Sequence, residues 1–256
     1  MRVLAASKEG VGVREIARAI SVSPAIAQRL ISSLAKSGFA EQESSRRYRV
    51  GLGAFAVGNA FLSSNMLARE SYAELQTLAD RHQLNSYLGV LRGNAIAYLA
   101  TFQSSGPIAI KSSPGTQAHL HSTALGKVIL AQLPEETARE LLGAQPYLRL
   151  TARTTTRFSM LRTELAGARE KGYALCDEEN LVGVFAIGAP VRDASGATVA
   201  AISGALARHE LDRAKLPSLC RLVRDAAERI SLRLGAPPSP DSTPRRPTNA
   251  SRNRRS

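Results

Sequence analysis

Apolar side chains recur at three- and four-residue spacing in two short segments near the beginning of the chain, residues 13–20 and 24–34. This spacing predicts two amphipathic helices, each with one face to bury. Ser23 and Pro24 predict the start of the second helix, because a serine hydroxyl caps free amides and proline suits the first helical position. The positions expected to face the core are Ile16, Ala17 and Ile20 in the first helix and Ile26, Leu30, Ile31 and Leu34 in the second.

Gly38 predicts the end of the second helix, and residues 39–43 and 46–50 then alternate around a polar turn, as two strands of a hairpin do. Two helices joined by a tight turn and followed by a hairpin are typical of a winged helix-turn-helix, which fits the DNA major groove. A small structural module without DNA contacts is the alternative. Charge favours DNA, because residues 1–52 hold nine Lys/Arg against four Asp/Glu.

Residues 53–82 have a helical apolar pattern and predict one long linker helix, which either pairs with its twin in a dimer or packs on its own domain. Beyond it the pattern changes to strands interleaved with helices, and this predicts an α+β body with an antiparallel sheet covered by helices. The expected strands are 86–92, 95–102, 108–111, 173–176, 184–190 and 198–203, and the expected helices are 124–133, a short one opening at Pro134, 159–171 and 211–234.

The chain thus divides into a DNA-binding domain at 1–52, the linker helix at 53–82, an effector-binding and oligomerisation domain at 83–235, and a tail at 236–256. The tail holds five prolines and five arginines and almost no apolar residue, so we expect it to be disordered. It either adds non-specific affinity for DNA or only keeps the protein in solution.

Composition narrows the class of protein further. A chain of 256 residues with 44% apolar content is long enough for two folded domains. It has no apolar run long enough to span a membrane and no secretory signal, so we expect a cytoplasmic protein without a membrane partner. Its two cysteines predict buried, reduced thiols rather than a disulfide framework.

No nucleophile elbow, phosphate-binding loop or series of metal ligands is present in the sequence. His119 and His121 would place two imidazoles on one side of a strand, but no third ligand follows by spacing. For Asp177, Glu178 and Glu179 an acidic turn that faces water fits better than a cation site or ion pairs with arginine. We therefore expect no enzyme activity, no metal and no cofactor, although a DNA-tethered enzyme remains an alternative.

The exposed positions near the start of the second helix are the ones expected to meet base edges. Gln28 suits a bidentate contact to adenine, Arg29 suits guanine or a phosphate, and the methyl of Ala25 suits thymine. Arginines on the wing are expected to hold the DNA backbone without reading sequence. The full set of predicted DNA-binding residues is Ser23, Ala25, Gln28, Arg29, Ser32, Arg46, Arg47 and Arg49.

A free helix start favours an anion, and the segment Ser122 to Gly126 places several backbone amides at one. Ser122 or Thr123 caps this helix, and Gly126 permits close approach. A small carboxylate ligand would suit these amides. The alternative is a plain helix cap above a cavity that side chains fill. The segment as a whole comprises Ser122, Thr123, Ala124, Leu125 and Gly126.

Taken together, these segments resemble the IclR family of bacterial transcriptional regulators. The resemblance covers nearly everything before the tail, and its specificity comes from the order and spacing of motifs that are weak singly. It implies a winged helix-turn-helix domain, a linker helix and a GAF-like effector domain in a homodimer or dimer of dimers on a palindromic double-stranded operator. The motifs are residues 13–17, 28–34, 38–39, 47–52, 121–127, 172–179, 183–191 and 200–203.

The same resemblance implies that the effector cavity is closed by Cys176, Asp177, Val184, Ala186 and Ser203. Some relatives have polar or thiol side chains where this chain has alanine, so the effector is expected to be a small organic acid, aromatic or long-chain rather than of two or three carbons. An architectural DNA-binding protein without a ligand is the remaining alternative.

Two departures from the family pattern qualify the resemblance. The family's first helix starts well before its helix-turn-helix, whereas only Met1 to Lys8 precede Glu9 here. This leads to the hypothesis that the native N-terminus lies upstream. The family also often has a lysine and small hydroxyl residues where this chain has Pro24 and Ala25. The operator sequence therefore does not carry over from relatives.

Overall fold

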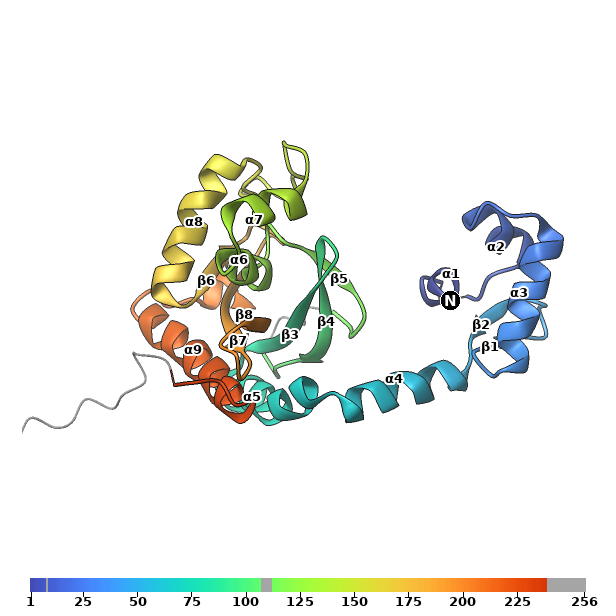
Figure 1. Cartoon of the computed structure of the whole chain (residues 1–256), viewed down its shortest axis with the longest axis horizontal. Helices are drawn as coiled ribbons and strands as arrows, with labels where there is room; N and C mark the ends of the chain where they lie inside the picture. The colour runs from blue at the N-terminus through green and yellow to red at the C-terminus, as the bar shows by residue number, and fades with distance from the viewer. Residues whose placement is uncertain (8, 107–111, 239–256) are drawn as a thin grey trace, which may run out of the picture. The chain divides into compact units, whose positions relative to one another are not determined.

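A computed structural model of the chain describes residues 1–7, 9–106 and 112–238. It divides into two compact units, Met1–Asn65 and Met66–Ser256, which are described separately below (Figure 1). The strand expected at 108–111 and all but the first three residues of the expected tail lie outside the described residues. No helix in the described ranges is long and apolar enough to cross a membrane.

The first unit is a winged helix-turn-helix, as predicted. Ser23 caps α3 through its hydroxyl, which accepts a hydrogen bond from the Ile26 amide at 3.4 Å. The two wing strands pair antiparallel, with Ala40 opposite Val50. The elements of this unit are α1 (Arg2–Ala5), α2 (Val13–Ala19), α3 (Pro24–Lys36), β1 (Ala40–Gln42), β2 (Tyr48–Val50) and α4 (Leu52–Ser64).

The apolar face expected for α3 is partly wrong. Ala27 and Ile31 are buried, whereas Ile26 and Leu30 are about half exposed. Ile20 of the expected first-helix face, just beyond α2, is also exposed. Because Ala27 carries only a methyl group, it fits where α2 and α3 lie closest, and this turns the two larger side chains away from the core.

The expected linker helix is divided into two helices, α4 and α5 (Met66–His82). Asn65 between them has ψ of 105°, an extended conformation that interrupts the helical hydrogen bonds. Helix α4 contains no charged side chain and buries none of its residues, whereas α5 buries Leu75, Leu78 and Ala79. The two halves of the predicted linker therefore differ in their surroundings.

The second unit is built on an antiparallel six-stranded sheet in the order β5-β4-β3-β8-β7-β6, which confirms the predicted α+β class. Strands β7 and β8 share the longest register, from Val184 opposite Ala207 to Arg192 opposite Thr198. The strands are β3 (Asn85–Arg92), β4 (Ala95–Phe102), β5 (Gln117–His119), β6 (Ala174–Asp177), β7 (Val184–Arg192) and β8 (Thr198–Ala207).

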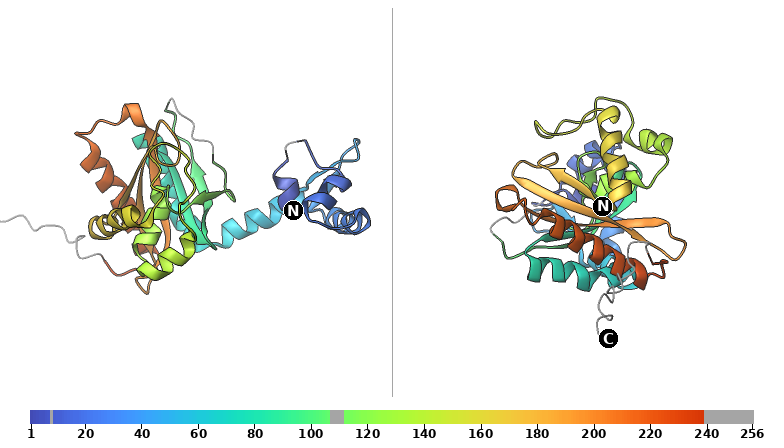
Figure 2. Two further views of the ribbon diagram at one scale, coloured as in Figure 1. Left: turned by 90° about the horizontal axis from the view of Figure 1, so that it is seen from above. Right: turned by 90° about the vertical axis from the view of Figure 1, so that its left-hand side faces the viewer.

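Helices cover both faces of this sheet (Figure 2). On one face α5 and α9 (Leu216–Arg233) pack Leu75, Val223 and Ile230 against the strands. On the other face lie α6 (Ala124–Ala131), α7 (Glu135–Leu142) and α8 (Phe158–Lys171), whose core includes Leu125 and Leu161. The expected start of the last helix at residue 211 is wrong, because a short 3-10 turn at Arg208–Glu210 and the loop after it come before α9.

Candidate functional site

The predicted base-reading positions lie on the first half of α3. Ser23, Ala25, Gln28 and Arg29 are exposed and Ser32 is half-buried. The side-chain amide of Gln28 donates hydrogen bonds to Ser32 Oγ at 3.0 Å and to the Tyr48 hydroxyl at 3.3 Å. These bonds hold the Gln28 side chain between α3 and the wing.

The wing arginines have different surroundings. Arg47 forms a two-pronged ion pair with Glu15 of α2, at 3.2 and 2.9 Å, and also donates to the Gly10 carbonyl. Arg49 pairs with Glu41 at 3.1 Å and with Glu43 at 3.6 Å. Arg46 stands at the wing turn with φ of 60°, and within the described residues it has no ion-pair partner. Of the three arginines, Arg46 alone has its charge uncommitted among the described residues.

A cavity of about 70 Å³ lies in the second unit between the start of α6 and the sheet. The structure places seven of the predicted effector residues on its walls: Thr123, Ala124, Leu125, Cys176, Val184, Ala186 and Ser203. It adds Tyr87, Tyr98, Ser112, Asn180, Leu181 and Ala205. None of these lining residues is charged. The tyrosines were missed because alternating strand residues do not reveal which face a distant helix will cover.

Thr123 is the cap of α6, which decides between the two candidates left open by the sequence. Its hydroxyl accepts from the Gly126 amide at 3.1 Å and donates to the His119 carbonyl at 2.7 Å. Within the described residues the amides of Ala124 and Leu125 have no hydrogen-bond acceptor. Two backbone donors at the positive end of a helix dipole therefore border the cavity.

Two glycines in the sheet allow the start of α6 to lie directly against the strands. A Cβ on Gly188 would lie 2.6 Å from the Ala124 carbonyl oxygen. A Cβ on Gly89 would lie 3.0 Å from a methyl of Leu125. At these two positions the strands have no side chain that would push the start of α6 away from the sheet.

Three predicted effector residues do not line the cavity. Ser122 instead donates to Asn180 Oδ1 at 3.2 Å, and Gly126 packs on the backbone of Leu120. Asp177 forms ion pairs with Arg208 at 2.5 Å and with Arg153 at 3.4 Å. Successive strand residues point to opposite faces, so Cys176 faces the cavity and its neighbour Asp177 cannot.

Ser203 is one of three hydroxyl side chains on the sheet side of the cavity, with Tyr87 and Tyr98. It lies opposite Tyr87 in the β3–β8 register, is only 4% exposed, and has no hydrogen-bond partner within the described residues. A ligand atom at this position would gain a hydrogen bond that the protein does not supply. The helix amides and this hydroxyl are donors from two separate walls.

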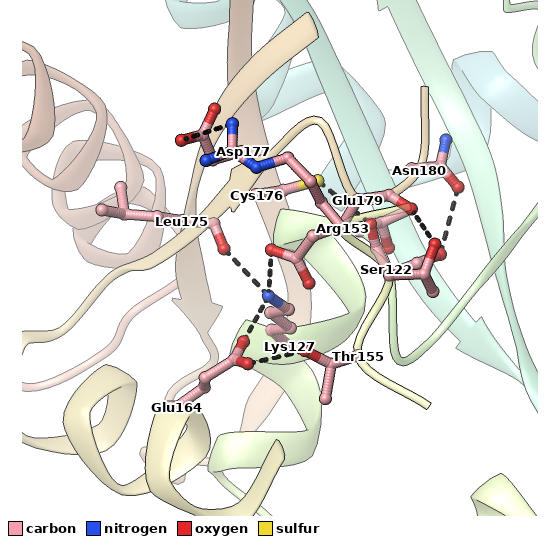
Figure 3. Close-up of polar contacts among 12 residues, drawn as sticks. Ser122, Lys127, Arg153, Thr155, Glu164, Leu175, Cys176, Asp177, Glu179 and Asn180 are labelled. Carbon is pink, nitrogen blue, oxygen red and sulfur yellow. Dashed lines mark hydrogen bonds and ion pairs between the residues drawn. The ribbon is translucent and has the colours of Figure 1, made fainter. Parts of the chain in front are cut away.

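Cys176 is buried, as predicted, and its thiol donates to the Ser122 carbonyl at 3.0 Å (Figure 3). Burial raises the pKa of the thiol to about 11. A thiol at this pKa remains protonated at neutral pH and presents a weakly polar wall to the cavity. Cys220 is buried on α9 on the other face of the sheet.

The two candidate histidine ligands do not form a metal centre. His121 Nε2 contacts the Leu148 carbonyl oxygen at 2.9 Å, and burial lowers the pKa of this imidazole. Its ring packs against His119 and Tyr147. In the part of the chain that the structure describes, no three His, Cys, Asp or Glu side chains gather as a metal site would require.

Comparison with known proteins finds matches along both units. Residues 1–44 match the IclR helix-turn-helix domain, and residues 59–232 match the bacterial transcriptional regulator IclR C-terminal domain. The glycerol operon regulatory protein of Streptomyces griseus is 32% identical, over 92% of this chain and 93% of that protein. The regulator BhcR of Paracoccus denitrificans is 30% identical, over 89% of this chain and 82% of its own.

Solved structures show the same architecture. The Thermotoga maritima IclR crystal structure has a TM-score of 0.75 and 27% identity, and the match covers 91% of this chain and 95% of that one. An IclR homologue from Microbacterium hydrocarbonoxydans, complexed with 4-hydroxybenzoate, has a TM-score of 0.77, with 88% and 91% of the two chains covered. At 21% identity this second likeness concerns the fold alone.

Proposed function

Because this chain belongs to the IclR family of bacterial transcriptional regulators, we propose that it binds a palindromic operator as a dimer or tetramer and changes its DNA affinity when a small organic acid occupies the cavity. Members of the family are regulators rather than enzymes. The proposed place of action is the cytoplasm, where the operator lies. Coupling requires that the acid favour one arrangement of the DNA-binding units over another.

The proposal is supported by the amides of Ala124 and Leu125 and the hydroxyl of Ser203, which border the cavity and have no hydrogen-bond partner in the part of the chain that the structure describes. A carboxylate at the helix start would accept both amide hydrogen bonds, and the helix dipole favours its charge. At about 15 Å³ for each water-sized group, the cavity holds a small acid as it stands. A ring such as that of 4-hydroxybenzoate fits only if Leu181 or a tyrosine moves.

Thermal unfolding in the presence of a panel of acids from pyruvate to 4-hydroxybenzoate tests this. A ligand of the folded state raises the melting temperature by mass action. Ser203→Ala should weaken the affinity for the best acid by about fivefold, since a hydrogen bond is worth about 1 kcal/mol. The matched control Ser195→Ala, on the β7–β8 turn outside the cavity, should leave its affinity unchanged.

DNA binding is tested by footprinting on the promoter next to the protein's own gene, with and without the best acid. Protection that the acid strengthens or releases supports the proposal. Protection that no acid alters, together with an unchanged melting temperature, would make the protein architectural and remove its role as a sensor. Absence of any preference over scrambled duplex would overturn operator binding itself.

We propose a second copy of the chain as the partner of α4. A helix that is apolar all round is normally buried, yet α4 exposes Leu52, Phe55, Val57 and Phe61 and carries no charge that would keep it in water. Two copies of such a helix cover each other without leaving a charge unpaired. A palindromic operator likewise requires two copies of α3.

Light scattering on a sizing column at micromolar concentration tests the pairing. Phe55→Glu should convert the dimer to monomer, because each copy would bury a carboxylate against an apolar helix. Gln76→Glu adds the same charge on the exposed side of α5 and should leave the mass unchanged. A wild-type chain that is monomeric at every concentration would contradict the proposal.

A further inference from the structure

Lys127 is a charged side chain in the interior of the second unit, only 2% exposed. Its ammonium contacts three elements at once: Glu164 on α8, the Leu175 carbonyl of β6 at 3.2 Å, and Glu179 Oε1 at 2.6 Å (Figure 3). Burial alone would lower the pKa of Lys127, but the two carboxylates outweigh it and raise the pKa. The lysine therefore remains charged inside the protein.

The two carboxylates differ in their access to water. The Glu164 side chain is 37% exposed and also accepts from the Thr155 hydroxyl at 2.9 Å. The Glu179 side chain is 11% exposed, and its second oxygen, Oε2, is buried without a partner within the described residues. Glu179 thus depends on Lys127 for its charge compensation, whereas Glu164 does not.

Glu179 belongs to the segment between β6 and β7, and this segment closes one side of the cavity. The next two residues, Asn180 and Leu181, line it. The outer part of the segment is held separately, because Glu178 pairs with Arg153 and accepts from the Gly183 amide. Its inner edge is held by side chains at several points: Lys127 pairs with the Glu179 side chain, the Thr154 hydroxyl donates to the Glu179 carbonyl at 2.7 Å, and Ser122 donates to Asn180. Of these, Lys127 is the charged group.

We propose that Lys127 is a positioning residue for the effector cavity: its ammonium keeps the carboxylate of Glu179 in the interior and so keeps Asn180 and Leu181 over the cavity. That the cavity is an effector site rests on the function proposed above, whereas the contacts of Lys127 with Glu179 and Glu164 are independent of that function. A buried carboxylate that loses its partner is strongly unfavourable. Without Lys127, the Glu179 carboxylate either takes up a proton, since burial already raises its pKa, or moves to water together with the segment that carries it; only the second outcome opens the cavity.

Cys176 and Cys220 provide a readout that needs no ligand, because they are the chain's two cysteines and both are buried. Cys176 lines the cavity, whereas Cys220 lies on α9 on the opposite face of the sheet. In a Cys220→Ser background, alkylation by iodoacetamide reports access to the cavity. In a Cys176→Ser background, the same reagent reports general loosening of the unit.

We expect Lys127→Met to raise the alkylation rate of Cys176 at least tenfold and that of Cys220 less than twofold. Glu164→Gln is the matched control, since it removes the other carboxylate and leaves Lys127 paired with Glu179. It should keep the Cys176 rate within twofold of wild type. Adding Glu179→Leu to Lys127→Met should return the rate to within threefold, because no stranded charge then remains.

Equal acceleration of both thiols by Lys127→Met would overturn the proposal, because it would mean general destabilisation. An unchanged Cys176 rate, or a double variant that stays as fast as the single one, would overturn it too. These outcomes are independent of the effector. If no acid raises the melting temperature while the thiol pattern is as expected, the sensing function fails and the role of Lys127 stands.

Discussion

Helices α3 and α6 begin in the same way but in opposite surroundings. Each starts with a hydroxyl residue whose side chain accepts the amide three positions later, Ser23 from Ile26 and Thr123 from Gly126. The first three residues of α3 are exposed, whereas every residue of α6 is buried. One helix start therefore presents side chains outward, and the other presents backbone amides inward.

The third position of each helix shows what the surroundings require. Ile26 in α3 is 47% exposed and contacts little. A Cβ on Gly126 in α6 would lie 2.2 Å from the Leu120 carbonyl oxygen, closer than real Cβ atoms approach. The same hydroxyl cap thus marks where each helix begins, and the packing around the first turn decides whether side chains or backbone amides are available there for binding.

The largest effect expected from this difference is at those third positions. Gly126→Ala should cost about 3 kcal/mol of stability, because the new methyl group overlaps backbone that cannot rotate away. Ile26→Ala should change stability by less than about 0.5 kcal/mol, as surface changes usually do. Urea unfolding followed by circular dichroism measures both. Equal costs would remove the contrast between the two helices.

The outward-facing side chains of α3 are tested by Gln28→Ala. If Gln28 reads an adenine edge, the variant should lose about 1–3 kcal/mol on the operator and little on random duplex. Its two N–H groups donate to Ser32 and Tyr48, so the contact to adenine exchanges one of these bonds for the base while the other keeps the amide in place. Fluorescence anisotropy on both duplexes gives the comparison. Losses of equal size would remove the base-reading role.

The losses of stability caused by removing the two capping hydroxyls should differ by a smaller amount. Thr123→Val should cost about 1–2 kcal/mol, because it strands a buried amide and also removes the bond to the His119 carbonyl. Ser23→Ala should cost about 0.5–1 kcal/mol, since water replaces the exposed cap bond. Urea unfolding of the two variants side by side decides the order. A larger loss at Ser23 would contradict it.

The smallest effect concerns phosphate contacts on the wing. Arg46→Ala should lower the slope of log affinity against log salt by about 0.9, the value for one neutralised phosphate. Arg49→Ala should change it less, because Arg49 is already paired with Glu41 and Glu43. Salt titrations on random duplex measure both slopes. A larger change at Arg49 would mean that DNA displaces its carboxylates.

Features determined by neighbouring residues could be predicted from the sequence. The start of α3 follows from Ser23 and Pro24, and the end of α8 follows from Gly172, which has φ of 74°. Caps and breakers act within one turn, so their consequences are local. The break at Asn65 escaped prediction because the apolar spacing continues across it.

Features determined by distant contacts could not be predicted. Lys127 has the spacing of an ordinary helical residue, and its partners Glu164 and Glu179 come from segments far along the chain. The ion pair of Arg47, predicted to contact the DNA backbone, could not be foreseen either, because its partner Glu15 lies on another element. Asp177 was included with Cys176 because adjacency in sequence gives no indication of which face a cavity will occupy.

The glycines under α6 have a consequence for how such a sensor changes its preference. At Gly188 the strand supports the backbone of Ala124 directly, and at Gly89 it makes room for the Leu125 side chain, so the height of the helix above the sheet does not depend on Ala186 or Ala205. Ala186 and Ala205 lie on the cavity floor beside them. Enlarging either alanine would reshape the space that discriminates among acids while leaving undisturbed the two amides that hold a carboxylate.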